Sequence, residues 1–375
     1  MKKSLIKKNK IIRIINNSLV DLPSPSNLNT IWNFGSILGI LLITQIISGL
    51  FLSFHYTADI NSTFSAIVSI NYNINNGWFL RAIHANGASF FFLFIYAHTL
   101  RNIYFNSFFL KITWLSGVTI LLISIITAFV GYVLPWGQIS FWGATVITNL
   151  VSAIPYLGII LVEWIWGGFS VENPTLNRFF SFHFILPFIL LFIVIIHLIF
   201  LHDTGSSNPS GIRSNSDKIP FHPFYSSKDI LGLILILISL IILTSLFPNL
   251  LTDPENFLKA NPLVTPTHIQ PEWYFLFAYT ILRRIPNKLG GVIALIIAIA
   301  ILYLFPISNI NSWQRIKFIP EKKFFFSILF FNLVILTWLG RKPVDFPFNS
   351  LAIILSPTYF ILIIILPLLN IKIKK

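Results

Sequence analysis

Eight long apolar segments dominate the sequence and restrict what the chain can fold into. They cover approximately residues 34–54, 78–104, 112–133, 179–201, 230–247, 291–305, 324–339 and 351–369. A helix of about 20 apolar residues crosses the roughly 30 Å hydrocarbon core of a bilayer. The segments therefore predict an all-α polytopic membrane protein with eight transmembrane helices.

The composition excludes the common soluble classes. Only 10% of the residues are charged and the mean hydropathy is +0.80, whereas a soluble domain carries about 25% charged residues. The chain has no cysteine, which excludes disulfide scaffolds, thiolate metal sites and cysteine nucleophiles. Any metal must be held by the eight histidines or by the few carboxylates.

The net charge of +14 reflects an orientation in the membrane. Eight spans place both termini on one side, and eighteen of the 26 basic residues then lie on that side. Because basic loops stay on the negative, non-translocated side, we expect both termini there. This distribution accounts for the charge without nucleic acid. The basic first twenty residues lack a cleavage site for a signal peptide and predict an amphipathic surface helix.

Two loops of about forty residues each connect spans three to four and five to six. Both fall on the positive side. They are too apolar and too rich in Trp and Tyr for solvated linkers, so we expect short helices at the membrane interface. Long structured loops on one side of a protein usually carry function.

Four histidines lie inside apolar spans, where ionisable side chains are costly and usually functional. His84 and His98 lie in the second span, His183 and His197 in the fourth, and each pair is 14 residues apart. Fourteen helical residues return to within roughly 40° of the same face after about 21 Å. Both spans cross in the same direction, so the spacing predicts two facing pairs, His84 with His183 and His98 with His197.

Each histidine pair suits haem iron better than zinc. Zinc takes four ligands, whereas a porphyrin supplies the other four ligands to an iron held by two imidazoles. Arg81 and Arg101 are placed to meet anionic propionates. Two glycine pairs repeat the interval of 14: Gly35 with Gly49, and Gly117 with Gly131. Because glycine has no side chain, these positions would leave space at two depths for two flat macrocycles in a bundle of the first four spans.

Other interpretations stay open from these residues alone. The histidines could be hydrogen-bonded contacts between helices, and the glycines alone indicate close helix packing. A transporter or channel could use such histidines to relay protons or to bind its substrate, although none of the first four spans contains Asp or Glu. A structural haem-binding anchor is a third possibility.

Motifs along most of the chain resemble one family. They include RAIHANGAS, GYVLPWGQISFWGATVITNL, HLIFLHDTGSSNPSGI and PEWYFLFAYTILRRIPNKLGGV, and from about Asn311 onward the likeness is mostly hydropathy. The chain resembles the mitochondrial cytochrome b family, the membrane core of ubiquinol:cytochrome c oxidoreductase (the cytochrome bc complex). The resemblance implies an N-terminal surface segment (1–31), a four-helix di-haem domain with an interfacial helical loop (32–210) and a C-terminal domain of four spans with the PEWY loop (211–375).

The resemblance implies two b-type haems. His84 and His183 would ligate the low-potential haem near the positive side, and His98 and His197 the high-potential haem near the negative side. Ubiquinol would give one electron to an iron–sulfur partner and the other to the two haems in turn, and the second electron would reduce quinone on the negative side. The protons released and taken up on opposite sides would contribute to a proton gradient. A structural haem anchor leaves the PEWY motif unexplained.

The resemblance also places a quinol-oxidation site on the positive side. Glu272 of PEWY would accept a quinol proton, because burial in an apolar segment should raise the pKa of this carboxylate toward a useful range. Without the motif, Glu272 would be interpreted as a surface acid at a helix N-terminus. The remaining residues implied for this pocket are Tyr132, Tyr279, Phe129, Gly143 and Pro271.

On the negative side, the resemblance implies a quinone-reduction site made of His202, Ser206, Lys228 and Asp229. His202 alone could equally be an interfacial histidine, and Lys228 an ordinary charge of the negative side. The partners implied are an iron–sulfur protein, a cytochrome c-type subunit and membrane lipids, in a homodimeric complex. The implied location is the mitochondrial inner membrane, with both termini in the matrix.

Two residues depart from the family pattern near PEWY. Arg284 follows Arg283 where the family usually has a small residue, and the added positive charge either alters docking or is neutralised by a carboxylate. Gln270 stands where a basic residue is common. These changes bear on partner fit and inhibitor sensitivity, and neither touches a haem ligand.

Overall fold

The computed structural model describes residues 9–212, 214–307 and 320–369. Eight helices in these residues are long and apolar enough to cross a membrane, which confirms the predicted all-helical fold. They are α3 (Phe34–Ser53), α5 (Gly77–Tyr104), α6 (Lys111–Val133), α9 (Asn173–Thr204), α10 (Phe224–Leu246), α12 (Lys288–Ala300) with its 3₁₀ extension η7 (Ile301–Ile307), α13 (Pro320–Gly340) and α14 (Phe348–Leu368).

The long loops fold into short helices, as the sequence predicts. The first loop contains α7 (Gln138–Asn149), η4 (Leu150–Ala153) and α8 (Gly158–Trp166), and the second contains η5 (Pro254–Phe257), η6 (Trp273–Phe275) and α11 (Leu276–Arg284). The remaining described elements are α2 (Lys10–Ile15), η1 (Asn16–Val20), η2 (Thr30–Asn33), α4 (Thr63–Tyr72), η3 (Ser107–Phe109) and two short antiparallel strands, β1 (Pro23–Pro25) and β2 (Lys218–Pro220).

Most spans begin and end close to their predicted bounds, but α10 begins at Phe224, ahead of the expected residue 230, and α9 begins at Asn173, ahead of the expected residue 179. The cause is local. Pro174 suits the first helical turn, where no backbone donor is needed, and Thr175 Oγ1 accepts a hydrogen bond from the Glu172 N–H at 3.2 Å. Apolar periodicity cannot detect this polar first turn.

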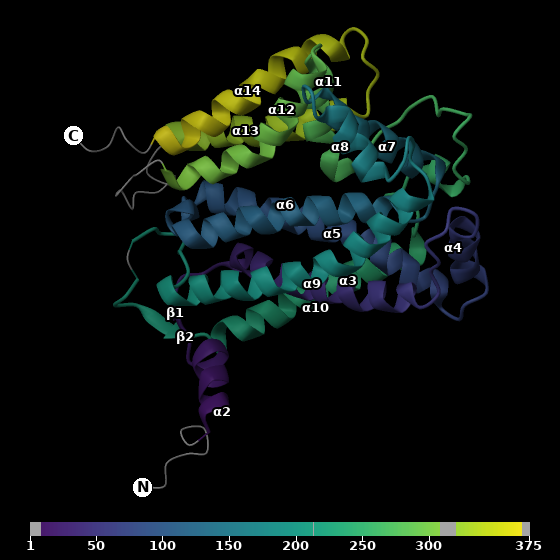
Figure 1. Cartoon of the computed structure of the whole chain (residues 1–375). Coiled ribbons are helices and arrows are strands. Elements are labelled where there is room, and N and C mark those ends of the chain that lie inside the picture. Colours follow the sequence, from purple (N-terminus) through teal and green to yellow (C-terminus); the bar gives the residue numbers. More distant parts are fainter. Residues whose placement is uncertain (1–8, 213, 308–319, 370–375) are drawn as a thin grey trace.

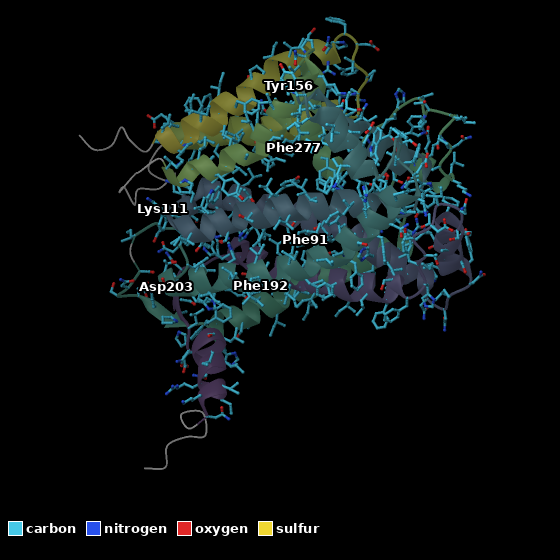
Figure 2. The ribbon with its side chains drawn as sticks, viewed as in Figure 1. Phe91, Lys111, Tyr156, Phe192, Asp203 and Phe277 are labelled. Carbon is cyan, nitrogen blue, oxygen red and sulfur yellow. The ribbon has the colours of Figure 1, made fainter. Side chains whose placement is uncertain are left out.

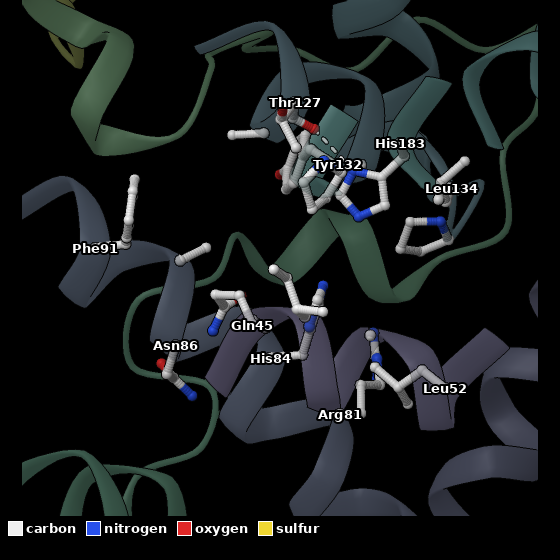
Figure 3. A pocket seen from close by; sticks show the side chains of 18 of the residues that line it. Gln45, Leu52, Arg81, His84, Asn86, Phe91, Thr127, Tyr132, Leu134 and His183 are labelled. Carbon is white, nitrogen blue, oxygen red and sulfur yellow. Dashed lines mark hydrogen bonds between the residues drawn. The ribbon is translucent and has the colours of Figure 1, made fainter. Parts of the chain in front are cut away.

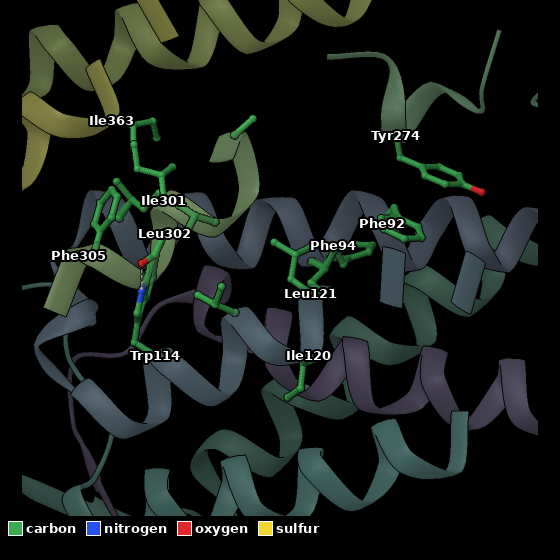
Figure 4. Close-up of a cluster of buried hydrophobic side chains, with 14 of the residues drawn as sticks. Phe92, Phe94, Trp114, Ile120, Leu121, Tyr274, Ile301, Leu302, Phe305 and Ile363 are labelled. Atoms are coloured by element: carbon green, nitrogen blue, oxygen red, sulfur yellow. Dashed lines mark hydrogen bonds between the residues drawn. The ribbon is translucent and has the colours of Figure 1, made fainter. Parts of the chain in front are cut away.

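The helices form one bundle in which α3 packs against α5 and α6 against α9 (Figure 1). Helix α10 packs against α3 and α5, while α11, α12, α13 and α14 pack together on the other side of the bundle. A continuous apolar core joins the two groups. For example, Trp114 of α6 donates its indole N–H to the Leu302 carbonyl at 2.8 Å and stacks on Phe305 (Figure 4).

The two ends of the bundle carry different elements. The strands β1 and β2, helix α2 and the end of α14 lie at one end, and α4, α7 and α8 lie at the other (Figure 1). Lys111 and Asp203 lie at the first end, whereas Phe91 and Phe192 lie between the ends (Figure 2). Phe192 is 63% exposed, as expected for a side chain that faces lipid.

Ten of the eighteen basic residues assigned to the terminal side lie outside the described residues. They are Lys2, Lys3, Lys7, Lys8, Arg213, Arg315, Lys317, Lys372, Lys374 and Lys375. The helix expected in the first twenty residues is described only from Lys10, where α2 exposes Ile11 and Ile14.

Candidate functional site

His84 of α5 and His183 of α9 face one another across a cavity near the α7 and α8 end of the bundle (Figure 3). Their ring centroids lie 6.0 Å apart and their planes are 85° apart. A metal–imidazole bond of about 2.0–2.1 Å on each side, with an imidazole radius of about 1.2 Å, would place the centroids roughly 6.4 Å apart. The observed separation of 6.0 Å is slightly shorter than this and close to the spacing of two imidazoles on one central metal ion.

His98 and His197 form the second pair, nearer the other end of the same two helices, and they lie within electrostatic range of each other. Arg101 places its Nη2 3.2 Å from His98 Nδ1 and its guanidinium carbon 5.1 Å from the Trp32 ring centroid. The buried Nε of Arg101 has no hydrogen-bond partner among the described residues. A buried, incompletely paired guanidinium suits an anionic group such as a propionate.

Each of the four imidazoles packs against a glycine of the neighbouring helix. A Cβ atom on Gly49 would lie 2.9 Å from His84 Cε1, and one on Gly117 would lie 3.3 Å from His197 Cε1. The corresponding distance from Gly35 to His98 Cε1 is 3.6 Å, and a Cβ atom on Gly131 would collide with the ring of His183. From the sequence we expected these glycines to leave space for macrocycles, and in the structure the imidazole rings lie against the same four glycines.

The rest of a metal site would have to come from a cofactor. Within the described ranges, no group of three or more His, Cys, Asp or Glu side chains could hold a metal ion. Each histidine pair supplies two ligands, so it fits a group that brings its own equatorial ligands, as a porphyrin does. Arg81 lines the cavity of the first pair, with its guanidinium carbon 5.8 Å from the Phe257 ring centroid.

The cavity between His84 and His183 also reaches the PEWY segment. It has a volume of about 290 Å³, and its wall includes Tyr132, Glu272 and Tyr274 as well as the two histidines. Tyr132 lies beside His183 in Figure 3. A ligand-sized apolar cavity with a few polar groups is the usual form of a small-molecule site.

Contacts with α5 fix the PEWY segment at this cavity. Tyr274 stacks on Phe92 with centroids 4.1 Å apart and planes 5° apart (Figure 4). The Tyr96 hydroxyl donates to the Tyr274 carbonyl at 2.6 Å, and the Trp273 indole N–H donates to Ser89 Oγ at 3.1 Å. These contacts leave Glu272 on the cavity wall.

Glu272 is the titratable carboxylate of the cavity. Burial raises its pKa to about 7, the nearby charge of Asp253 adds to the increase, and the Tyr132 hydroxyl and Arg341 oppose it. A carboxyl group with a pKa near 7 exchanges a proton easily at physiological pH. The sequence prediction of a raised pKa therefore agrees with the structure.

Comparison with known proteins identifies the family. Residues 19–205 match the family model described as Cytochrome b/b6/petB, and residues 259–360 match the model described as Cytochrome b(C-terminal)/b6/petD. A solved structure titled "Hyperthermophilic respiratory Complex III" superposes with a TM-score of 0.91 at 32% sequence identity, covering 98% of each chain. The chain belongs to the cytochrome b family. Membership implies b-type haem, and the two histidine pairs are the candidate ligands.

The other residues expected at the oxidation site of this cytochrome b do not lie on the wall of the cavity. Phe129 packs against Phe179, with ring centroids 5.9 Å apart, and the Tyr279 hydroxyl donates to the Ile269 carbonyl at 3.0 Å. A Cβ atom on Gly143 would have nothing within 4 Å. None of these three residues lines the cavity, and neither does Pro271.

The two long loops of the cytochrome b are joined beside the cavity. The Gln138 N–H donates to the Leu258 carbonyl at 2.9 Å, and the Ala260 N–H donates to the Trp136 carbonyl at 3.0 Å. Asn256 Oδ1 accepts a hydrogen bond from the Ser140 N–H at 3.0 Å. Sequence analysis missed these pairings, because contacts between distant loops leave no periodic pattern.

The two departures from the family pattern have defined partners. Gln270 Nε2 donates to Asp253 Oδ2 at 3.1 Å, which holds Asp253 beside Glu272. Arg284 donates to the side-chain oxygen of Asn349 at the start of α14. Of the two alternatives for Arg284, the described residues do not favour neutralisation by a carboxylate, since its hydrogen-bond partner is an amide.

Lys228 and Asp229 are fixed near the start of α10. Ser36 Oγ donates to Asp229 Oδ1 at 2.8 Å, and Asn33 Nδ2 donates to the Lys228 carbonyl at 2.7 Å. Lys228 Nζ donates to the Leu28 carbonyl at 3.1 Å. Sequence analysis missed Asn33 and Ser36, although each is a polar residue at the edge of an apolar span.

The structure does not bring all four residues expected at the reduction site together. Ser206 lines a separate cavity of about 610 Å³, together with Lys111 and Lys218. His202, Lys228 and Asp229 do not line that cavity. Lys228 and Asp229 instead contact Leu28, Asn33 and Ser36, which lie before and within the first turn of α3.

Proposed function

We propose that this cytochrome b is the core redox subunit of a ubiquinol:cytochrome c oxidoreductase. It would oxidise ubiquinol on the positive side of the membrane and reduce quinone on the negative side, contributing to a proton gradient. The observation that carries this proposal is the shared cavity, in which a carboxyl group with a pKa of about 7 lies with the histidine pair of a candidate redox centre. Proton and electron acceptors for one quinol would then be adjacent.

The chain's own residues would hold two haems. His84 with His183 would ligate the low-potential haem, and His98 with His197 the high-potential haem. When bound, these haems would supply one-electron acceptors at two depths, with potentials tuned by the axial ligands and burial. The four glycines let the imidazoles pack closely on helix backbones.

At the oxidation site, Glu272 would act as the proton acceptor. Its ionised form would take the proton from a quinol hydroxyl, since a general base works best with a pKa near the operating pH. The Tyr132 hydroxyl donates a hydrogen bond to Glu272, which orients the carboxylate and stabilises its charged form. Tyr279 would shape the site from behind, through its bond to the segment that precedes Pro271.

At the reduction site, Lys228 and Asp229 would provide protons and hydrogen bonds for the quinone oxygens, and His202 and Ser206 are the further residues expected there. Ser36 holds one carboxylate oxygen of Asp229. A quinone that accepts two electrons must also take up two protons, so donors are required at both carbonyl oxygens.

The membership and the complex III match support partners of the same complex. We propose an iron–sulfur protein at the α7 and α8 end, a cytochrome c-type subunit, membrane lipids and a homodimeric complex. The motifs favour the mitochondrial inner membrane with both termini on the matrix side.

The test is spectroscopic and kinetic, on the purified complex. A reduced-minus-oxidised spectrum with haem quantification should give two b-type haems per chain. Glu272→Gln should slow quinol oxidation and leave both haems bound. Fewer than two haems per wild-type chain would contradict the ligand assignment, and loss of both haems in Glu272→Gln would contradict the role given to Glu272.

A further inference from the structure

Two serine–glycine pairs lie under two of the four candidate axial imidazoles. Ser48 and Gly49 of α3 contact His84, and Ser116 and Gly117 of α6 contact His197. The glycine lets the ring approach the helix, and the serine before it places a hydroxyl oxygen at the Nδ1 atom of the ring. The distances from Oγ to Nδ1 are 2.9 Å for Ser48 and 2.8 Å for Ser116.

The direction of the Ser48 hydrogen bond follows from its other partner. Ser48 Oγ donates its single proton to the Thr44 carbonyl at 2.7 Å, so it must accept from His84 Nδ1. The Gln45 carbonyl is a second acceptor for the His84 ring. Both contacts require the proton of the neutral imidazole to be on Nδ1, which leaves the Nε2 lone pair free to bind a metal.

The same reasoning applies to His197. Ser116 Oγ donates to the Thr113 carbonyl at 2.9 Å and therefore accepts from His197 Nδ1. The Thr113 carbonyl is again a second acceptor for the ring. The two serines thus repeat one arrangement on two different helices, facing histidines of two different pairs.

The other two imidazoles have different support. His183 Nδ1 lies 2.9 Å from the Thr127 carbonyl and needs no hydroxyl group. His98 Nδ1 faces Arg101, whose guanidinium is a donor. Each histidine pair therefore contains one imidazole that is supported by a serine hydroxyl.

We propose that Ser48 and Ser116 are positioning residues, each fixing the Nδ1–H form of one axial imidazole, and that they tune one haem each. This inference rests on the proposed haem ligation. An Nδ1–H group that donates to an acceptor makes its imidazole a more basic ligand. A more basic ligand stabilises the ferric state, so each serine lowers the midpoint potential of its own haem.

The test is a redox titration of b-type haems in the purified complex carrying Ser48→Ala or Ser116→Ala. Ser48→Ala should raise the midpoint potential of the low-potential haem alone, and Ser116→Ala that of the high-potential haem alone. We expect a shift of up to tenfold in the reduction equilibrium, which is 59 mV for a one-electron couple, because a carbonyl acceptor stays in place. Low-temperature electron paramagnetic resonance of the ferric haems should show the same selectivity.

Ser124→Ala is the matched control. Ser124 is a buried serine that lines the His84 cavity, and its Oγ donates to the Ile120 carbonyl at 2.7 Å without contacting a histidine. Removal of the Ser124 hydroxyl should leave the midpoint potentials of both haems unchanged. The variant Ser48→Thr keeps the hydroxyl group, so the low-potential haem should have its wild-type midpoint potential.

Three outcomes would overturn the inference: unchanged potentials, equal shifts of both haems in a single variant, or an equal shift in Ser124→Ala. If Ser48→Ala fails to assemble, Ser116→Ala decides the question at the other pair. Failure of the proposed function is recognised separately, because the wild-type complex would then lack two b-type haems.

Discussion

A glycine series on α3 tests the packing of the candidate haem ligands within one helix. Gly49, Gly35 and Gly39 differ in what a Cβ atom would meet. On Gly49 it would lie 2.9 Å from His84 Cε1, on Gly35 it would lie 3.6 Å from His98 Cε1, and on Gly39 it would have nothing within 4 Å. Alanine at the three positions should therefore have graded effects.

The magnitudes follow from contact distances. Carbon atoms pack at about 3.5–4.0 Å, so Gly49→Ala must displace the His84 ring by roughly 0.6–1.1 Å. Overpacking of this kind costs about 1–3 kcal/mol, which corresponds to a loss of roughly 5- to 150-fold in haem affinity. Gly35→Ala makes an ordinary contact and should cost less than about 0.5 kcal/mol. Gly39→Ala should stabilise α3 by up to about 1 kcal/mol through helix propensity.

The assay is haem content and redox titration of the three variant complexes. Gly49→Ala should lose or weaken the low-potential haem and keep the high-potential haem, while Gly35→Ala and Gly39→Ala should keep both. Thermal unfolding of the complexes separates a local effect at the haem from a global loss of stability. If Gly49→Ala retained the low-potential haem as firmly as Gly39→Ala, the packing argument would be refuted.

Three further predictions concern the proton-handling groups. Quinol oxidation by the wild-type complex should accelerate as the pH rises through about 7, because only the ionised form of Glu272 accepts a proton. The substitution Glu272→Gln should abolish this pH dependence and lower the rate of quinol oxidation by about 10²- to 10⁴-fold. Asp253→Asn should move the midpoint of this pH profile to lower pH, since the charge of Asp253 raises the pKa of Glu272; an unchanged midpoint would contradict that coupling. Asp229→Asn should slow oxidation of the high-potential haem by added quinone without changing the rate of quinol oxidation, and equal losses at both sites would contradict a local role.

The depth of the functional groups could be predicted from the sequence, because helix geometry converts residue number into position along an axis. The interval of 14 predicted that His84 is level with His183, and the structure places their rings 6.0 Å apart. Hydropathy likewise predicted the eight spans. Both predictions depend only on the regular rise and rotation of a helix.

What the sequence could not show depends on rotation about side-chain bonds and on loop contacts. Nothing in the chain order indicates that the Ser48 hydroxyl meets His84 or that the Arg284 partner is Asn349. The placement of Ser206 on a separate cavity also depends on how the loop after α9 folds back. These features arise from tertiary packing, which periodic patterns do not encode.

The arrangement of glycines and histidines explains why the haem candidates occur as two levels in one bundle. Gly35 and Gly49 of α3 face the histidines of α5, and Gly117 and Gly131 of α6 face the histidines of α9. Each helix pair therefore carries its own rings on its own backbone, and the two pairs also pack against each other through α3 and α9. A displacement of one helix pair relative to the other would then change both histidine pairs together, whereas a substitution at one glycine would change a single level. Because a substitution at one glycine affects a single histidine pair, the glycine series tests the packing of that pair and not the packing of the whole helix bundle.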